Sequence, residues 1–291
     1  MPDGCARVPD VSTRALVLGG GGIAGIAWEI GLLAGLAAEG VDVGDADLVV
    51  GTSAGSIVGT LLRTGPDLAG LYEGQLGPVP PTEKRTDFDA TEMMTAIGAA
   101  LAGVTDAQEA RARVGALALQ AATVPEEERR ATIRGRIGEP AWPDRRLVVT
   151  AVDAQDGAFA AFDGDSGVAL LDAVAASCAV PLVYPPITIG GGRYIDGGMR
   201  SITNADLAAG CDTVLIVAPF PGAPGSPLGP SHEDEVAELR KTAEVHVVLA
   251  DEASLQAFGT NPLDPATREP SALAGRAQAA AVVEQLRALW R

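Results

Sequence analysis

The sequence predicts a three-layer α/β fold, in which a mostly parallel central sheet carries helices on both faces. Short apolar runs alternate along the chain with longer segments of helical composition, as parallel strands joined by helical crossovers require. The chain has 291 residues, of which 47% are hydrophobic, and this suits the core of one large α/β unit. We therefore expect residues 1–291 to form a single domain.

Strands and helices are expected to follow one another in order. Apolar runs bounded by turn residues predict strands at 15–18, 47–51, 147–152, 193–195, 213–218 and 245–249. Helical composition predicts helices at 25–39, 54–63, 169–178, 203–209, 233–243 and 272–290. The first of these helices lies in the segment Ile23 to Glu39, which is apolar nearly all round, and this indicates that protein covers the helix on every side.

The run from Gly19 to Ala38 also has the length of a membrane span. Its four leading glycines and the central charge of Glu29 argue against that alternative. We expect a buried helix of a water-soluble fold instead.

The alternation of strands and helices breaks between Thr64 and Asp144. A Pro-rich loop at 77–81 is followed by three segments of helical composition, at 91–101, 106–122 and 125–137. We expect residues 64–144 to form a helical cap insertion beside the site described below, with ordinary crossover packing as the alternative.

The chain is strongly acidic, with a formal net charge of -17 and a sequence pI near 4.4. Its two lysines, Lys84 and Lys241, lie far apart, and there is no basic run. This balance disfavours nucleic-acid binding and opposes adhesion to anionic lipid surfaces.

The cysteines are three in number and widely spaced, at Cys5, Cys178 and Cys211. Such spacing suggests neither a disulfide framework nor a metal site. The first fourteen residues lack a basic-then-apolar secretion signal, so the cytoplasm is the expected compartment.

A serine flanked by glycines, in the segment Gly51-Thr52-Ser53-Ala54-Gly55, stands between an expected strand and an expected helix. This Gly-x-Ser-x-Gly arrangement lifts the serine onto a sharp turn above a sheet, as a nucleophile requires. The glycines are needed because a side chain at 51 or 55 would collide with the neighbouring strand and helix. The alternative is an ordinary Gly/Ser turn that caps a helix.

Four glycines, Gly19 to Gly22, follow the first expected strand directly. Acyl transfer needs donors where a carbonyl oxygen becomes negative, and backbone N–H groups are the usual source. Only residues without side chains let the chain turn these groups towards a substrate. Gly20, Gly21 and Gly22 are therefore candidates for an oxyanion hole.

Asp196 ends the short strand at 193–195 and is followed by Gly197 and Gly198. A serine hydroxyl needs a base to take its proton. The two histidines of the chain are poorly placed for this role, because His246 lies in an expected strand and His232 in a polar run that begins a helix. Asp196 is therefore the candidate base, although an aspartate before Gly-Gly is also common in turns.

Together these segments resemble the patatin-like phospholipase family, whose members use a Ser-Asp dyad. The resemblance runs from about Ala15 to Leu249, with the motifs in family order. The matching segments are Gly20–Gly25, Gly51–Gly55 and Asp196–Gly198, with weaker matches at Ala176–Pro181, Tyr184–Pro186 and Asn204–Asp206.

The resemblance implies a serine acyl hydrolase that cleaves fatty-acyl esters of lipids through an acyl-enzyme. Ser53 would be the nucleophile, Asp196 the base, and Gly20, Gly21 and Gly22 the oxyanion hole. It implies no cofactor or metal ion. The implied partner is a lipid or other ester substrate, which the protein could bind at a membrane surface.

One position departs from the family pattern, because Ala24 stands where a basic residue is often found before the last glycine. With the acidic surface, this departure favours neutral or zwitterionic esters over anionic ones. The acyl chain is expected to lie on apolar residues of the insertion, which are Met93, Met94, Ile97, Leu101, Leu117 and Leu119.

Three alternatives stay open at this point. Gly20-x-Gly22-x-x-Gly25 after a strand also fits a dinucleotide-binding (Rossmann) loop, although no acidic residue ends the second strand to hold a ribose. A histidine-based α/β-hydrolase could use His232 or His246. A catalytically silent lipid-binding module of the same fold is the third.

Overall fold

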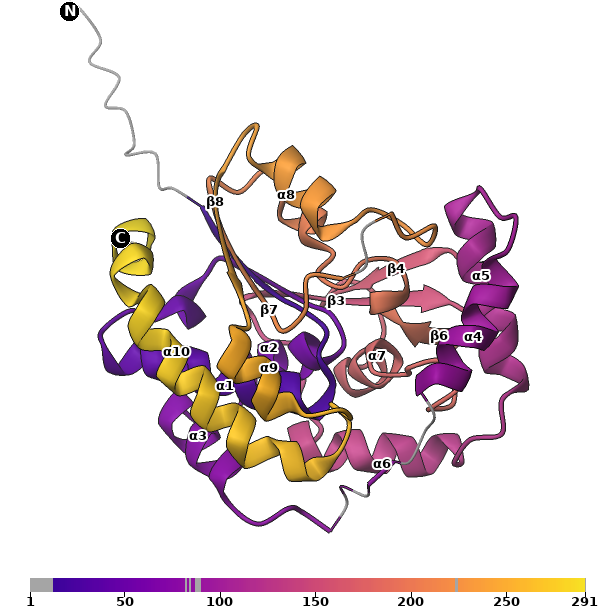
Figure 1. Cartoon of the computed structure of the whole chain (residues 1–291), viewed down its shortest axis with the longest axis horizontal. Coiled ribbons are helices and arrows are strands. Elements are labelled where there is room, and N and C mark those ends of the chain that lie inside the picture. The colour runs from indigo at the N-terminus through magenta and orange to yellow at the C-terminus, as the bar shows by residue number, and fades with distance from the viewer. Residues whose placement is uncertain (1–12, 82, 84, 87–89, 223–224, 291) are drawn as a thin grey trace, which may run out of the picture.

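The computed structural model describes residues 13–81, 83, 85–86, 90–222 and 225–290. Its centre is an eight-stranded sheet in the order β5-β6-β3-β2-β1-β7-β8, with β4 paired to β3 (Figure 1). The strands are β1 (Arg14–Leu18), β2 (Leu48–Gly51), β3 (Arg146–Asp153), β4 (Phe159–Phe162), β5 (Ile187–Ile189), β6 (Gly192–Asp196), β7 (Thr213–Ala218) and β8 (Glu244–Leu249).

Five neighbouring strands, from β3 through β2, β1 and β7 to β8, are parallel. The remaining strands pair antiparallel at one edge, β4 and β6 with β3 and β5 with β6. The predicted mostly parallel sheet is therefore confirmed, with an antiparallel margin that places the end of β6 beside β3.

Helices cover both faces of this sheet (Figure 1). They are α1 (Gly22–Ala38), α2 (Ala54–Thr64), α3 (Leu68–Leu76), α4 (Ala90–Leu101), α5 (Ala107–Gln120), α6 (Glu126–Ile137), α7 (Leu170–Ser177), α8 (His232–Leu239), α9 (Glu252–Phe258) and α10 (Arg268–Leu289). Alternate residues of β1 face opposite layers, since Leu16 and Leu18 join the core under α1, α2, α7 and α10 whereas Ala15 and Val17 join the core under α8. The three-layer α/β arrangement is confirmed.

Helix α1 is buried along almost its whole length, as predicted. It packs against α10 with backbones in contact: a Cβ at Gly31 would lie 2.1 Å from the Ala272 carbonyl oxygen, and a Cβ at Gly275 would lie 2.2 Å from that of Trp28. Glu29 lies in this interior, where burial raises its pKa well above the ordinary range. This packing fixes the N-terminus of α1, which starts at the glycine segment.

The structure departs from the sequence prediction mainly in short elements. The segment expected as a helix at 203–209 is a 3₁₀ turn, Ala205–Ala208, and β4, β5, α3 and α9 were not predicted. Within the described ranges, no helix has both the length and the hydropathy for crossing a bilayer. Lys84 and the N-terminal segment with Cys5 lie outside the described residues.

In the described part of the insertion at 64–144, four helices pack separately onto the sheet and its covering helices. Helix α3 contacts α1 and α10, α5 contacts β3, and α6 contacts α2 and α7. In Figure 1 this part of the chain runs from α3 around one side of the molecule to α6. Among the described residues of the insertion, those that line the pocket beside the glycine-flanked serine belong to α6.

Candidate active site

Ser53 lies on a strained turn between β2 and α2, where the carboxyl ends of the parallel strands meet. Its φ of 52° is rare for a residue with a side chain. The flanking glycines make this turn possible: a Cβ at Gly51 would lie 2.6 Å from the Gly55 carbonyl oxygen, and a Cβ at Gly55 would lie 2.1 Å from that of Leu18. This is the geometry that the Gly-x-Ser-x-Gly motif predicted.

The end of α7 holds the turn from the other side. The hydroxyl of Ser177 accepts the Ser53 N–H at 2.9 Å, and the thiol of Cys178 lies 3.3 Å from the Ser53 carbonyl oxygen. The hydroxyl of Ser56 donates to the same carbonyl at 2.6 Å. The weak sequence match at 176–181 thus belongs to the support of the serine.

Asp196 ends β6 and faces Ser53 from the antiparallel margin of the sheet. The residue is 3% exposed, and its Oδ1 accepts the Gly198 N–H at 2.8 Å. Burial raises the pKa of this carboxyl to about 6, while hydrogen bonding from the Ser53 side chain and the Gly198 N–H, and the charge of Arg129, act in the opposite direction. The structure therefore brings the two predicted residues together.

Asn204 ties the serine turn to the segment that follows Asp196. Its side-chain amide lies 3.0 Å from the Thr52 hydroxyl and 3.3 Å from the Gly197 carbonyl oxygen, so it bridges the neighbours of both residues. Gly197 itself has no room for a side chain, since a Cβ there would lie 2.2 Å from the Thr150 hydroxyl. The spacing between Ser53 and Asp196 is therefore set by buried polar contacts.

The glycine segment lies against Ser53, as predicted, but its N–H groups are not equivalent. The Gly20 N–H donates to the Ile202 carbonyl oxygen at 2.9 Å and is occupied. In the described part of the chain, no hydrogen bond uses the N–H groups of Gly21, Gly22 or Ala54. Helices α1 and α2 begin at Gly22 and Ala54, so two positive helix ends converge here.

A small pocket lies beside Ser53, with a volume of about 20 Å³. It adjoins a cavity of about 280 Å³, with which it shares Ile23, Ile26, Ile57 and Arg136. Ile23 and Ile26 come from α1 and Ile57 comes from α2. The wall that the two spaces share is therefore mostly apolar, and its apolar part comes from the two helices that begin at the site.

The acyl-lining residues expected from the sequence do not line these two spaces. Ile97 and Leu101 pack in a separate cluster with Val114 and Ile195, and Met94 is 62% exposed. Met93 alone comes near, packing against the cluster of Val183, Tyr184 and Leu263. The expectation that these six residues line the acyl site was wrong, because α4 and α5 pack at the antiparallel edge of the sheet, away from the two spaces.

Two arginines of α6, Arg129 and Arg136, line the pocket beside Ser53. Neither arginine is predicted from the sequence as a site residue. They lie in a charged segment that is far from every motif and is typical of a solvated helix, so no local signal marks them. Ala24, by contrast, is fully buried in the main core and does not line the pocket.

The histidines occupy the elements expected of them. His232 begins α8 and faces Thr203, with 3.4 Å between its Nδ1 and the hydroxyl, whereas His246 lies in β8. Among the described residues, no hydrogen bond links either histidine to Ser53 or Asp196. Nor do three His, Cys, Asp or Glu side chains of that part of the chain gather where they could hold a metal ion.

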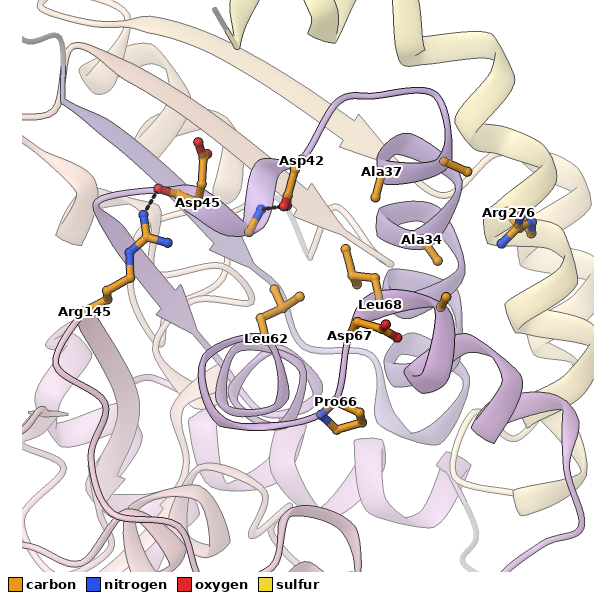
Figure 2. Close-up of a pocket in the computed structure, with 13 residues that line it drawn as sticks. Ala34, Ala37, Asp42, Asp45, Leu62, Pro66, Asp67, Leu68, Arg145 and Arg276 are labelled. Carbon is orange, nitrogen blue, oxygen red and sulfur yellow. Dashed lines mark hydrogen bonds between the residues drawn. The ribbon is translucent and has the colours of Figure 1, made fainter.

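Figure 2 shows a larger cleft, of about 540 Å³, which lies at the C-terminal end of α1, away from Ser53, and is lined in part by the segment that joins α1 to β2. It shares no lining residue with the pocket beside Ser53. Its acidic side chains are engaged in local structure: Asp42 accepts the Gly44 N–H at 2.9 Å, and Asp67 accepts the Gly70 N–H at 2.8 Å. The reactive groups lie in the smaller pocket, which we take as the candidate active site.

Residues 16–209 of the chain match the family described as patatin-like phospholipase. Among solved structures, the chain is similar to VipD from Legionella pneumophila (12% identity, TM-score 0.44, covering 94% of this chain and 67% of VipD). It is also similar to the type III effector protein ExoU (15% identity, TM-score 0.44, covering 94% of this chain and 53% of ExoU). No curated protein matches the chain.

The chain spans about half the length of ExoU. The matched range includes the glycine segment, the serine turn and Asp196. It also covers well over half of the chain. The chain therefore belongs to the patatin-like phospholipase family.

Proposed function

We propose that this chain is a serine acyl hydrolase that cleaves fatty-acyl esters of lipids with Ser53 as nucleophile and Asp196 as its base. The observation that carries the proposal is the pairing of these two buried side chains at the carboxyl edge of the sheet, with unused N–H groups beside them. Family membership supports lipid acyl hydrolysis. In this proposal residues 1–291 act as one catalytic domain, and α6 is the part of the 64–144 insertion that caps the site.

In the first step, Ser53 Oγ bonds to the ester carbonyl carbon while Asp196 accepts the hydroxyl proton. The carbonyl oxygen takes the negative charge and is held by the N–H groups of Gly21 and Gly22, with that of Ala54. Gly20 supports the segment through its bond to Ile202. When the tetrahedral intermediate collapses, the alcohol leaves with the proton from Asp196.

In the second step, water attacks the acyl-enzyme and Asp196 again accepts a proton. The oxyanion forms at the same N–H groups, and collapse releases the fatty acid and returns the proton to Ser53. The two helix N-termini favour negative charge at this position throughout.

The proposed base makes a specific prediction for the pH dependence. Asp196 must be ionised to accept a proton, so kcat/KM should fall as the pH drops through the pKa of about 6. We expect a half-maximum near pH 6 and a decline of about tenfold per pH unit below it. Release of octanoic acid from p-nitrophenyl octanoate, measured from pH 4.5 to 8.5, gives the profile.

The charge of Arg129 lowers the pKa of Asp196, so Arg129→Gln should move the half-maximum to higher pH. Arg134→Gln, an exposed change in the same helix, should leave it in place. A profile that neither variant shifts would assign the titration to a group other than Asp196.

The adjoining cavity of about 280 Å³ is the proposed acyl site, because it is lined near Ser53 by Ile23, Ile26 and Ile57. Each methylene buried there adds up to about 0.8 kcal/mol. We expect kcat/KM for p-nitrophenyl esters to rise as the acyl chain lengthens from two to about eight carbons.

The chain-length series also tests the proposed function as a whole. A folded protein that cleaves none of the esters would be a silent binding module. A flat or falling profile would show that the cavity does not receive the acyl chain. Ile57→Ala is the matched variant, since it should reduce the gain per methylene more than it reduces turnover of the acetyl ester.

A further inference from the structure

We propose that Arg129, supported by Arg136, binds an anionic oxyanion group of the substrate, either phosphate or carboxylate, beside Ser53. This inference rests on the proposed function and specifies its substrate class. In this proposal α6 supplies the positive charge that Ala24 cannot supply.

Arg129 is nearly buried, at 5% exposure, and yet its guanidinium is only partly used. Its Nη2 donates to the Cys178 carbonyl oxygen at 2.9 Å, and the group stacks on the Tyr184 ring, 3.6 Å from its centroid. Within the described residues, Nε is buried without a hydrogen-bond partner and Nη1 has none either. A buried cation with unused donors is costly unless a ligand pairs with it.

No carboxylate side chain forms an ion pair with Arg129 in the described part of the chain. The carboxylate whose charge acts on Arg129 is that of Asp196, and it is committed to Ser53 and Gly198. Stacking on Tyr184 fixes the plane of the guanidinium, so its remaining donors have a set direction. Planar forks of this kind match carboxylate and phosphate oxygens.

Arg136 lies two turns farther along α6 and lines the same pocket. Its Nε pairs with Glu83 at 2.9 Å, and Arg268 shares that carboxylate at 3.9 Å. Two buried guanidinium groups thus share one carboxylate, which leaves positive charge in excess. The pocket is therefore positive in a chain whose overall charge is -17.

This site reverses the expectation drawn from Ala24 and the acidic surface. The protein surface repels anionic membranes, but the pocket attracts an anionic group on a single substrate molecule. Monomeric substrates separate these two effects, since they present no charged interface.

The test uses octanoyl esters below their critical micelle concentrations, at pH 8, where Asp196 is ionised. The neutral substrate is 1-octanoylglycerol, and the anionic substrates are 1-octanoylglycerol 3-phosphate and 3-O-octanoylglycerate. We expect kcat/KM for at least one anionic ester to exceed that of the neutral ester about tenfold or more, as charge-assisted hydrogen bonds allow. A gain with both would show a general anion site, and a gain with phosphate alone a phosphate site.

Arg129→Gln should reduce this ratio to within about twofold of one, whereas Arg129→Lys should keep part of it because the charge remains. Arg134→Gln is the matched control, since it removes one positive charge from an exposed position of the same helix, and it should leave the ratio unchanged. A purely structural arginine would change the turnover of all three esters alike, so an unchanged ratio in folded Arg129→Gln would overturn the proposal.

A second measurement needs no variant of Arg129, which also anchors Cys178. Octyl phosphate should inhibit cleavage of the neutral ester at least about tenfold more strongly than trimethyloctylammonium, and calorimetry with Ser53→Ala should give the same order. Equal inhibition would contradict the anion site. If even the neutral ester is not cleaved, the proposed function fails, whereas cleavage without charge preference overturns this inference alone.

Discussion

Ser53→Ala and Asp196→Asn are each expected to lower kcat for ester hydrolysis by at least about three orders of magnitude, because each removes the nucleophile or its only base. Both variants should fold. Burial raises the pKa of Asp196 to about 6. The free energy of unfolding of the wild type therefore decreases as the pH rises from the ordinary aspartate pKa to that value, because the buried carboxyl must ionise in the folded state. Asparagine removes this penalty, so thermal unfolding at pH 8 should occur at or above the wild-type temperature.

His232→Ala and His246→Ala are the matched controls. Neither histidine reaches the dyad through the hydrogen bonds of the described residues, so kcat should remain within about tenfold of the wild-type value. The contradictory result is a collapse of kcat in either histidine variant without loss of fold, which would indicate a histidine base.

Gly22→Ala is expected to lower kcat by roughly 10²-fold, which is the scale of losing one oxyanion donor. Gly22 has a φ of 65°, and an added Cβ would lie 2.8 Å from the Pro262 carbonyl oxygen, so the segment must move. Inhibition by an octyl trifluoromethyl ketone, whose serine adduct resembles the tetrahedral intermediate, should weaken in parallel. The KM should change little.

Gly40→Ala is the control that separates the loss of an oxyanion donor from the general cost of placing alanine at a positive φ. Gly40 also has a positive φ, 81°, but an added Cβ there meets nothing within 4 Å and lies at the far end of α1. It should lower stability and leave kcat unchanged. If Gly22→Ala raised KM while kcat stayed at the wild-type value, the glycine segment would be a binding surface instead of an oxyanion hole.

The sequence predicts the central strands because their side chains are nearly all apolar, a pattern that burial on both faces imposes. Two strands at the antiparallel margin, β4 and β5, were not predicted because they are short and of mixed composition. Phe159–Phe162 contains two alanines and Ile187–Ile189 has three residues. Their pairing with β3 and β6 stabilises them, and such long-range pairing leaves little trace in local composition.

The serine turn and Asp196 could be predicted because their chemistry needs glycines at adjacent positions. Which glycine N–H groups already donate a hydrogen bond could not be predicted, since the acceptor for the Gly20 N–H is the carbonyl oxygen of Ile202, far along the chain. Arg129 and Arg136 escaped for the same reason: only the packing of α6 against α2 and α7 brings them to Ser53.

The central claim is that Ser53 is a nucleophile activated by Asp196, and reaction with an alkyl fluorophosphonate tests it most directly. Peptide mapping by mass spectrometry should locate a single adduct on Ser53. The adduct should be absent from Ser53→Ala and should form at least about 10²-fold more slowly in Asp196→Asn, while His232→Ala reacts as the wild type does. A folded wild-type chain that forms no adduct, or forms it on another residue, would contradict the account.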